Sequence, residues 1–226
     1  MPEIQPTMTG RATIPQGVVS GPDAWASYWG PVGSAGAWIR SRLAACRNAC
    51  RANGLDANQQ WRFSIAVVAV CGVATSWGAE EYNWNFGHDT MGEEQARTSN
   101  FFYFANQLDI AEDDRELGRP FVNLQAAANA IVSQAMYSMG PETARIVRDG
   151  NPVDGAYYVC SSLNSLQETG QLSPAASLAA VQQVYAQIPT ATREAAGLPV
   201  PAFDHTPVAT PRGGTSTPST PRGGTS

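Results

Sequence analysis

The stretch VATSWGAEEYNWNFGHD, from Val73 to Asp89, carries the side chains of this sequence that are best suited to hold a sugar. Flat aromatic rings stack on sugar rings, and asparagine amides can both donate to and accept from hydroxyl and acetamido groups. A concave site with aromatic walls and a few polar groups is typical of ligand binding. The candidate saccharide-binding residues are therefore Trp77, Tyr82, Asn83, Trp84 and Asn85.

The same rings also have a purely structural interpretation. The stretch begins where a long apolar segment stops, and large rings at such a place can close the end of a buried helix. The sequence favours this interpretation for Trp77 and Phe86. For Tyr82 and Asn83 it leaves the sugar-binding and the structural roles equally open.

A central helix must lead into this stretch. The segment WRFSIAVVAVCGVATS is apolar on nearly all sides, which predicts a buried helix over about Leu55–Ser76. Asp56 or Asn58 can cap its first turn. Before it, residues 35–53 place apolar side chains at helical spacing with arginines between them, which predicts an amphipathic helix.

The rest of the domain is also predicted to be helical. The segment FFYFANQLDIAEDDRELGRPF has aromatic residues first and charges after, which indicates a short hairpin or an irregular crossing segment. Proline and capping residues then mark further helices. These are expected at Leu124–Ser138, Pro141–Arg148, Val153–Gln167 and Pro174–Gln187, the last one capped by Ser173. The expected fold class is mainly α.

The order of these features resembles the lysozyme-like β-N-acetylglucosaminidases that cut peptidoglycan. In that family the central helix ends in a pattern like A-L-E-T-G-W-G, followed by N-x-N-[FP]-[FW]-[GN]-[IN]. The corresponding segments here are VATSWG at Val73–Gly78 and YNWNFG at Tyr82–Gly87. The segments FVNLQAAANAIV and GNPVDGAYYVCSSL are similar to two later segments of the family. The resemblance covers roughly residues 35–188. It implies a lysozyme-like helical domain that meets a peptidoglycan glycan strand.

One position departs from the family pattern in a way that affects catalysis. The general acid of the family is a Glu three residues before the Trp, and Ala74 stands there. A methyl group cannot protonate a glycosidic oxygen, and loss of a positioned general acid costs about 10²–10⁴-fold in rate. Ala74 is either a natural loss or a deliberate substitution. Ser76 and the pair His88-Asp89 depart from the pattern too, which favours natural loss.

Other carboxylates could replace the missing acid. Glu80 and Glu81 follow the Trp-Gly turn, at the mouth of the expected cleft. The acidic run Asp109–Glu116 occupies the region where the family often places a second carboxylate. Both sets also have the simpler interpretation of solvated loop charges.

The expected geometry joins these parts in one groove. Ala74 should lie at its base, and Tyr82 or Trp84 should form a wall. One carboxylate of the run Asp109–Glu116 should face Ala74 across the groove.

Composition restricts the classes of function. With 226 residues, 43% hydrophobic and 15% charged, the chain is expected to form one globular core with tails. A net charge of −5 argues against a nucleic-acid-binding protein. No apolar run reaches the roughly 18 residues of a membrane span, and the start MPEIQPTMTGR lacks signal-peptide features. We therefore expect synthesis in the cytoplasm, followed by incorporation into a particle or release by another route.

The four cysteines lie in apolar contexts, which predicts buried free thiols. They are Cys46, Cys50, Cys71 and Cys160. With two histidines and no CxxC or HxxxH spacing, the sequence indicates neither a metal site nor a cofactor.

Both ends of the chain differ from the domain expected at 35–198. Residues 1–34 are rich in Gly and Pro, and their Trp25, Tyr28 and Trp29 suit an arm that docks on another chain. Residues 199–226 contain TPRGGTS twice, which indicates a low-complexity tail. The tail is either flexible or a tether that orders only against a neighbour.

Three hypotheses of function follow. The leading one is a degenerate peptidoglycan-glycosidase fold that serves as a structural or cell-wall-docking component of a phage tail or contractile injection-type particle. The first alternative is an active peptidoglycan hydrolase, of β-N-acetylglucosaminidase or muramidase type, whose acid is Glu80 or Glu81 or was mutated at Ala74. The second alternative is an unrelated helical scaffold protein.

Overall fold

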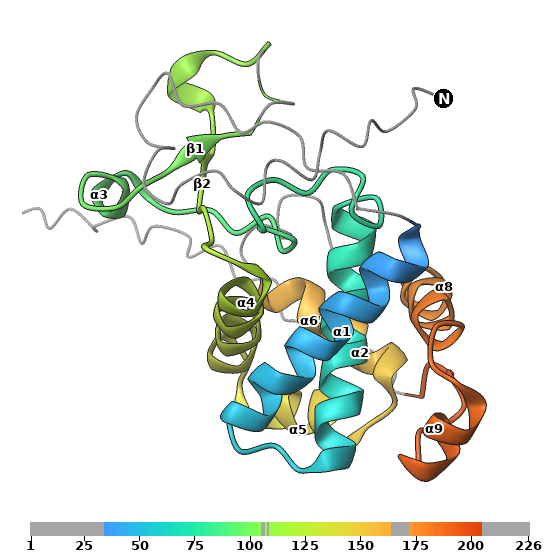
Figure 1. Ribbon diagram of the computed structural model, residues 1–226. Coiled ribbons are helices and arrows are strands. Elements are labelled where there is room, and N and C mark those ends of the chain that lie inside the picture. Colours follow the sequence, from blue (N-terminus) through green and yellow to red (C-terminus); the bar gives the residue numbers. More distant parts are fainter. Residues whose placement is uncertain (1–33, 105–106, 108, 164–171, 205–226) are drawn as a thin grey trace, which may run out of the picture.

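The computed structural model describes residues 34–104, 107, 109–163 and 172–204 (Figure 1). Within these ranges the chain is mainly helical, which confirms the predicted fold class. In the same ranges no helix combines the length and apolarity that a membrane crossing requires. The predicted N-terminal arm, the TPRGGTS repeats and the end of the helix expected over Val153–Gln167 lie outside the described residues.

The centre of the domain is the apolar helix α2 (Ala57–Ala74), as predicted. Every residue from Phe63 to Gly72 is buried, because this helix is covered on all sides. The helices that pack against it are α1 (Ala35–Ala52), α5 (Pro141–Asp149), α6 (Pro152–Ser162) and α8 (Pro174–Tyr185). A further helix, α4 (Leu124–Ser138), packs on α1 and α6 and has the bounds predicted for it.

Capping side chains decide where the helices begin. Asp56 accepts from the backbone N–H groups of Asn58 and Gln59, and the Gln59 side chain accepts in return from the Asp56 N–H, so that a capping box starts α2. The Asn123 side chain caps α4 by accepting from the Ala126 N–H, and Ser173 caps α8 as predicted. Each cap satisfies a backbone donor that the first helical turn leaves free.

The segment from Thr75 to Phe121, here called the small lobe, lies at the end of α2 (Figure 1). Its regular elements are the one-turn helix α3 (Glu93–Ala96), strand β1 (Phe102–Tyr103), the 3₁₀ helix η3 (Glu112–Asp114) and strand β2 (Leu117–Gly118). The two strands are antiparallel, with Phe102 opposite Gly118. A side chain at Gly118 would meet the Phe102 ring at 2.5 Å, so glycine is required there. The expected hairpin is therefore a minimal two-stranded one.

The chain continues to pack beyond the predicted domain boundary at residue 198. The Tyr185 hydroxyl donates to the Pro199 carbonyl oxygen (3.0 Å), and Asn151 Nδ2 donates to that of Val200 (2.8 Å). The Phe203 ring lies edge-to-face on Tyr157, with centroids 5.4 Å apart. A short helix that the sequence analysis did not anticipate, α9 (Thr190–Ala195), precedes this segment. The packed domain extends to at least residue 204.

Candidate functional site

The loop after α2 contains two tight turns built from left-handed residues. Ser76 and Trp77 have φ of 49° and 59°, and Asn83 and Trp84 have φ of 48° and 61°. The first turn closes with the Gly78 N–H on the Thr75 carbonyl oxygen (3.0 Å). The left-handed conformation costs about 1–2 kcal/mol for each residue with a Cβ. Strong contacts elsewhere in the loop must therefore hold these turns.

Core packing supplies those contacts. The Trp77 ring folds back over Gly72 of α2, where a Cβ would lie 2.3 Å from the ring. Trp77 and Phe86 both meet the buried Trp38 edge-to-face, with centroids 6.2 and 6.4 Å apart. Phe86 is completely buried. The structural interpretation of Trp77 and Phe86 is thus the one that the fold adopts.

The remaining aromatic and amide residues of the loop also face inward. Asn85 is completely buried, and its amide donates to the Asp89 carbonyl oxygen (2.8 Å) and accepts from the Asp89 N–H (2.7 Å). Tyr82 is buried with its ring edge-to-face on Phe104, and Trp84 is half-buried against the core. Asn83 is buried with its Nδ2 unbonded. These side chains build the loop and leave little surface for a sugar.

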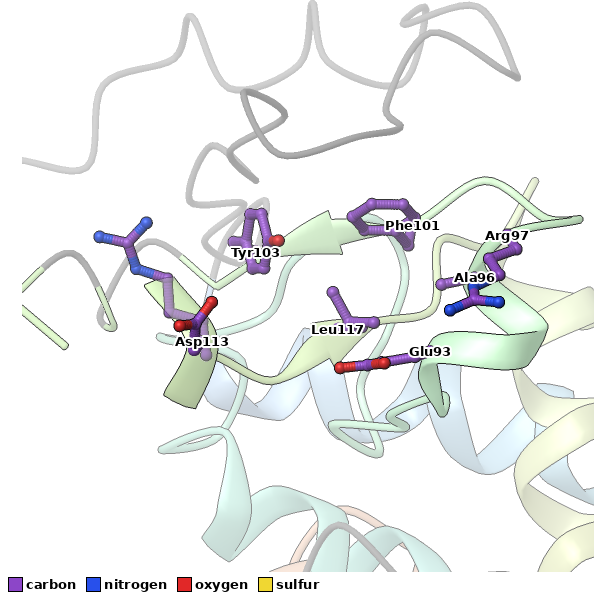
Figure 2. Close-up of a pocket in the computed structure, with 8 residues that line it drawn as sticks. Glu93, Ala96, Arg97, Phe101, Tyr103, Asp113 and Leu117 are labelled. Atoms are coloured by element: carbon purple, nitrogen blue, oxygen red, sulfur yellow. The ribbon is translucent and has the colours of Figure 1, made fainter. Parts of the chain in front are cut away.

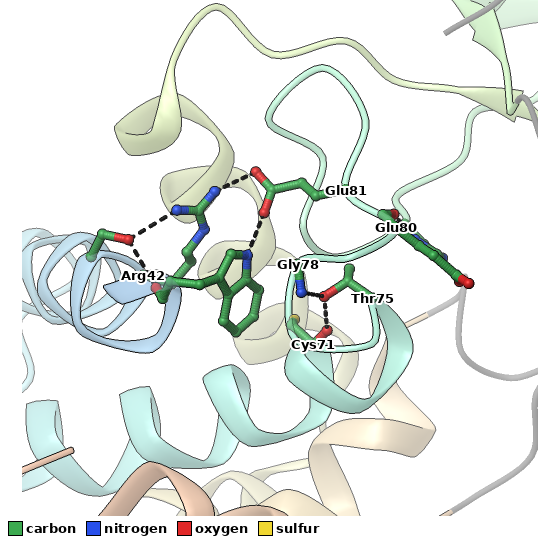
Figure 3. Close-up of polar contacts among 9 residues, drawn as sticks. Arg42, Cys71, Thr75, Gly78, Glu80 and Glu81 are labelled. Carbon is green, nitrogen blue, oxygen red and sulfur yellow. Dashed lines mark hydrogen bonds and ion pairs between the residues drawn. The ribbon is translucent and has the colours of Figure 1, made fainter. Parts of the chain in front are cut away.

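Glu81 is a structural carboxylate (Figure 3). It is 2% exposed, and its two oxygens accept from Trp38 Nε1 (2.6 Å) and from Arg42 Nη2 (2.5 Å). Both donors come from α1, so this carboxylate connects the small lobe to α1. Glu80 points the other way and is exposed. Neither predicted replacement acid combines burial with a free oxygen.

A groove of about 490 Å³ adjoins the loop. Arg119 connects the two, because its Nε forms an ion pair with Asp89 (3.1 Å) and its backbone N–H donates to the Asp89 carbonyl oxygen (3.0 Å). The Phe121 N–H donates to the carbonyl oxygen of Asn83 (3.0 Å). The groove is lined by Met91, Gln95, Ser99, Asn100, Arg119, Pro120, Phe121 and Val122.

The groove is lined mainly by uncharged polar and apolar residues, and its charged lining residue Arg119 is paired with Asp89. Gln95, Ser99 and Asn100 are exposed and offer amide and hydroxyl groups, while Phe121 offers a half-buried aromatic ring. No Asp or Glu is among the described residues that line it. The sequence analysis missed these residues because they are single polar side chains scattered between α3 and the residues after β2.

Asp89 is connected to the groove through the lining residue Arg119. Burial raises the pKa of Asp89, and the neighbouring Arg119 guanidinium partly opposes that rise. Asp89 does not line the groove itself. Asp89 makes two contacts with Arg119 and so holds the groove beside the aromatic loop. This is a structural role.

The groove expected at Ala74 stays a prediction. Ala74 ends α2 and is half-buried against the core, and it lines neither the groove nor a second pocket that contains Asp113. Tyr82 is buried, and Trp84 is half-buried against the core.

The chain matches no family model, no curated protein and no solved structure. The site is therefore interpreted from its own residues. Within the described ranges, no group of three or more His, Cys, Asp or Glu side chains is arranged to hold a metal ion.

Proposed function

We propose that this chain is a peptidoglycan-binding domain with a degenerate glycosidase fold, and that a glycan strand lies in the groove beside the aromatic loop. One observation carries the proposal. The groove presents amide, hydroxyl and aromatic groups, but no carboxylate among its described lining residues.

The lining favours sugar binding. A volume of about 490 Å³ is within the range of about 300–1,000 Å³ that is common for ligand pockets. Asn100 can donate and accept, and Gln95, whose Oε1 accepts from Arg119 Nη2 (3.3 Å), can donate its amide N–H groups, which matches sugar hydroxyl and acetamido groups. The Phe121 ring and the apolar Met91 and Pro120 provide surface for the less polar faces of a sugar ring.

The carboxylates favour binding without hydrolysis. Glycoside hydrolysis ordinarily needs two carboxyl groups that flank the scissile bond. Ala74 supplies none at the position that the resemblance implies, and both oxygens of Glu81 are engaged by donors. Glu80 is exposed and outside the groove lining.

The fold layout supports the resemblance at a coarse level. The central helix α2 ends where the small lobe begins, which is the arrangement that a lysozyme-like domain would have (Figure 1). Service in a phage tail or contractile injection-type particle is the setting we propose for such a wall-docking domain. That setting depends on the arm and the repeats outside the described residues.

Sedimentation with purified insoluble peptidoglycan tests the binding. The full chain should pellet with the wall material. The double variant Gln95→Ala/Asn100→Ala should bind about 30-fold more weakly, since each of the two lost hydrogen bonds is worth about 1 kcal/mol. The control Asn58→Ala/Gln183→Ala removes the same groups from exposed positions on α2 and α8 and should bind like the wild type. Equal binding by both double variants would place the glycan elsewhere.

Turbidity of the same wall suspension tests catalysis. It should stay constant with the wild-type chain. A fall with Ala74→Glu alone would support the descent from a hydrolase, whereas constant turbidity with both would agree with binding without hydrolysis. A fall with the wild type would contradict the proposal.

A further inference from the structure

A second pocket of the small lobe, of about 330 Å³, shares α3 with the groove (Figure 2). Gln95 of α3 lines the groove, and its neighbours Glu93 and Ala96 line this pocket. The lining consists of Glu93, Ala96, Arg97, Phe101, Tyr103, Asp113, Arg115 and Leu117. Two acids and two arginines in one small pocket distinguish it from the uncharged, amide-rich part of the groove.

Three of these charged side chains have no partner in the described structure. Glu93 and Arg97 are four residues apart, a spacing at which helical ion pairs are common, yet no salt bridge joins them. Within the described residues the side chain of Asp113 likewise takes part in no hydrogen bond or ion pair. These groups are therefore available to a ligand.

Apolar side chains lie between the charges. The Phe101 and Tyr103 rings pack edge-to-face, with centroids 5.8 Å apart, and Leu117 is paired with Tyr103 across the strands. Figure 2 shows Asp113 at one end of the pocket and Glu93 and Arg97 at the other, with these apolar groups in the middle.

Arg115 is held by two contacts. Its Nε donates to the Ile110 carbonyl oxygen (2.9 Å), and its guanidinium lies 5.9 Å from the centroid of the Tyr103 ring. The pocket thus combines apolar side chains with two acids and two arginines.

We propose that this pocket binds a short zwitterionic peptide with small apolar side chains, of the kind that peptidoglycan strands carry. The proposal rests on the proposed function and adds the peptide to the glycan as ligand. A carboxylate of the peptide pairs with Arg97, and an ammonium group pairs with Asp113 at the opposite end. A neutral sugar would leave these charges unmatched, whereas a peptide with both signs satisfies them.

The probe is a synthetic tripeptide of alanine, glutamate and diaminopimelate, titrated into the full chain by calorimetry. The wild type should bind it. Arg97→Gln and Asp113→Asn should each weaken binding about fivefold, because exposed ion pairs contribute up to about 1 kcal/mol. The controls Arg51→Gln and Glu194→Gln make the same changes at exposed positions of α1 and α9 and should bind like the wild type.

A chemically modified probe assigns the partner of Arg97. The same tripeptide with its terminal carboxylate amidated should bind the wild type about fivefold more weakly, as expected for one lost exposed ion pair. Arg97→Gln should bind the two tripeptides equally, because the variant has already lost that contact. If Arg97→Gln still binds the tripeptide with the free carboxylate more tightly than the amidated one, Arg97 is not the partner of that carboxylate.

Wall material with and without its peptides separates this inference from the proposed function. Intact walls should bind more tightly than walls stripped of peptide by an amidase, and stripped walls should still bind. If both bind equally and the tripeptide does not bind, the peptide site is wrong while the glycan proposal stands. If neither form of wall binds, the proposed function is wrong. If the Arg97 and Asp113 variants bind the tripeptide as tightly as the wild type, the tripeptide does not bind in this pocket.

Discussion

Glu81 accepts from Trp38 and from Arg42 at a place that water barely reaches. Two adjacent glutamates in a loop look equivalent in the sequence, and nothing in their immediate context shows which of them is buried. The distinction arises only when α1 brings its donors to one of the two. Desolvation of a buried ion pair can cost as much as the pair gains, but removal of one partner leaves the other unpaired in a low-dielectric environment and is strongly destabilising.

Glu81→Gln should therefore destabilise the domain by about 3–5 kcal/mol, because Arg42 would lose its counter-charge. Urea unfolding at neutral pH measures the change. Glu80→Gln, one residue earlier and exposed, should change the free energy of unfolding by less than about 0.5 kcal/mol. Similar small effects in both variants would show that the Arg42–Glu81 pair contributes little to the fold.

The four cysteines are buried and free, as the sequence predicted. Burial raises the pKa of Cys50 from its usual 9.0 to about 11, and burial raises the pKa of Cys71 further. Between pH 9 and 11 the unfolded chain loses the Cys50 proton, whereas the folded chain keeps it. The free energy of unfolding should therefore keep its full value below pH 9 and fall between pH 9 and 11.

The expected slope is up to about 1.4 kcal/mol per pH unit for each such thiol. Urea midpoints at several pH values from 7 to 11 measure it. Cys50→Ala should flatten the alkaline slope relative to the wild type. An unchanged slope would mean that Cys50 does not contribute to the loss of stability.

At the scale of elements, the junction between α2 and the loop includes a close contact between Gly72 and the Trp77 ring. Gly72→Ala should raise helix propensity by about 1 kcal/mol, yet the added methyl group must displace the ring. We expect a net loss of about 1–3 kcal/mol, as for other overpacked sites. Thermal unfolding and tryptophan fluorescence, which should shift to the red, measure it.

Gly140→Ser is the matched control. Gly140 is the N-cap of α5 with φ of −63°, and no atom lies within 4 Å of its would-be Cβ. The change should be neutral or slightly stabilising. A stabilised Gly72→Ala with unchanged fluorescence would contradict the role assigned to Trp77.

The helices were largely predictable because their signals are local. Asp56, Asn123 and Ser173 cap where the sequence predicts helix starts, and apolar periodicity marks the buried faces. The loop was not predictable, because a tryptophan with positive φ has no local signal. The turns at Trp77 and Trp84 exist only because the core accepts their rings.

At the scale of the whole molecule, the segment 199–204 closes over α6 and α8. A chain that ends after Leu198 should be about 3 kcal/mol less stable than one that ends after Asp204. The shorter chain loses hydrogen bonds worth about 1 kcal/mol each and part of the burial of Phe203. Thermal unfolding of the two truncations measures the difference, and equal melting temperatures would show that this segment is dispensable.

The candidate site was harder to predict than the fold because its two pockets combine residues from separate elements. Asn100 and Phe121 are far apart in the chain and meet only when the small lobe folds. The acidic run was noted in the sequence, but its member Asp113 lies opposite Arg97 rather than opposite Ala74. Such juxtapositions depend on tertiary structure, which composition and periodicity do not encode.

The one-turn helix α3 contributes side chains to both pockets, and this has a consequence for avidity. In a wall strand the sugar and its peptide are covalently joined, so under the two proposals occupancy of one pocket presents the second group at an effective concentration in the millimolar range. Two weak contacts then act as one chelating contact. A small domain with shallow pockets could in this way discriminate intact wall from loose sugar or loose peptide, although it would hold either fragment only briefly.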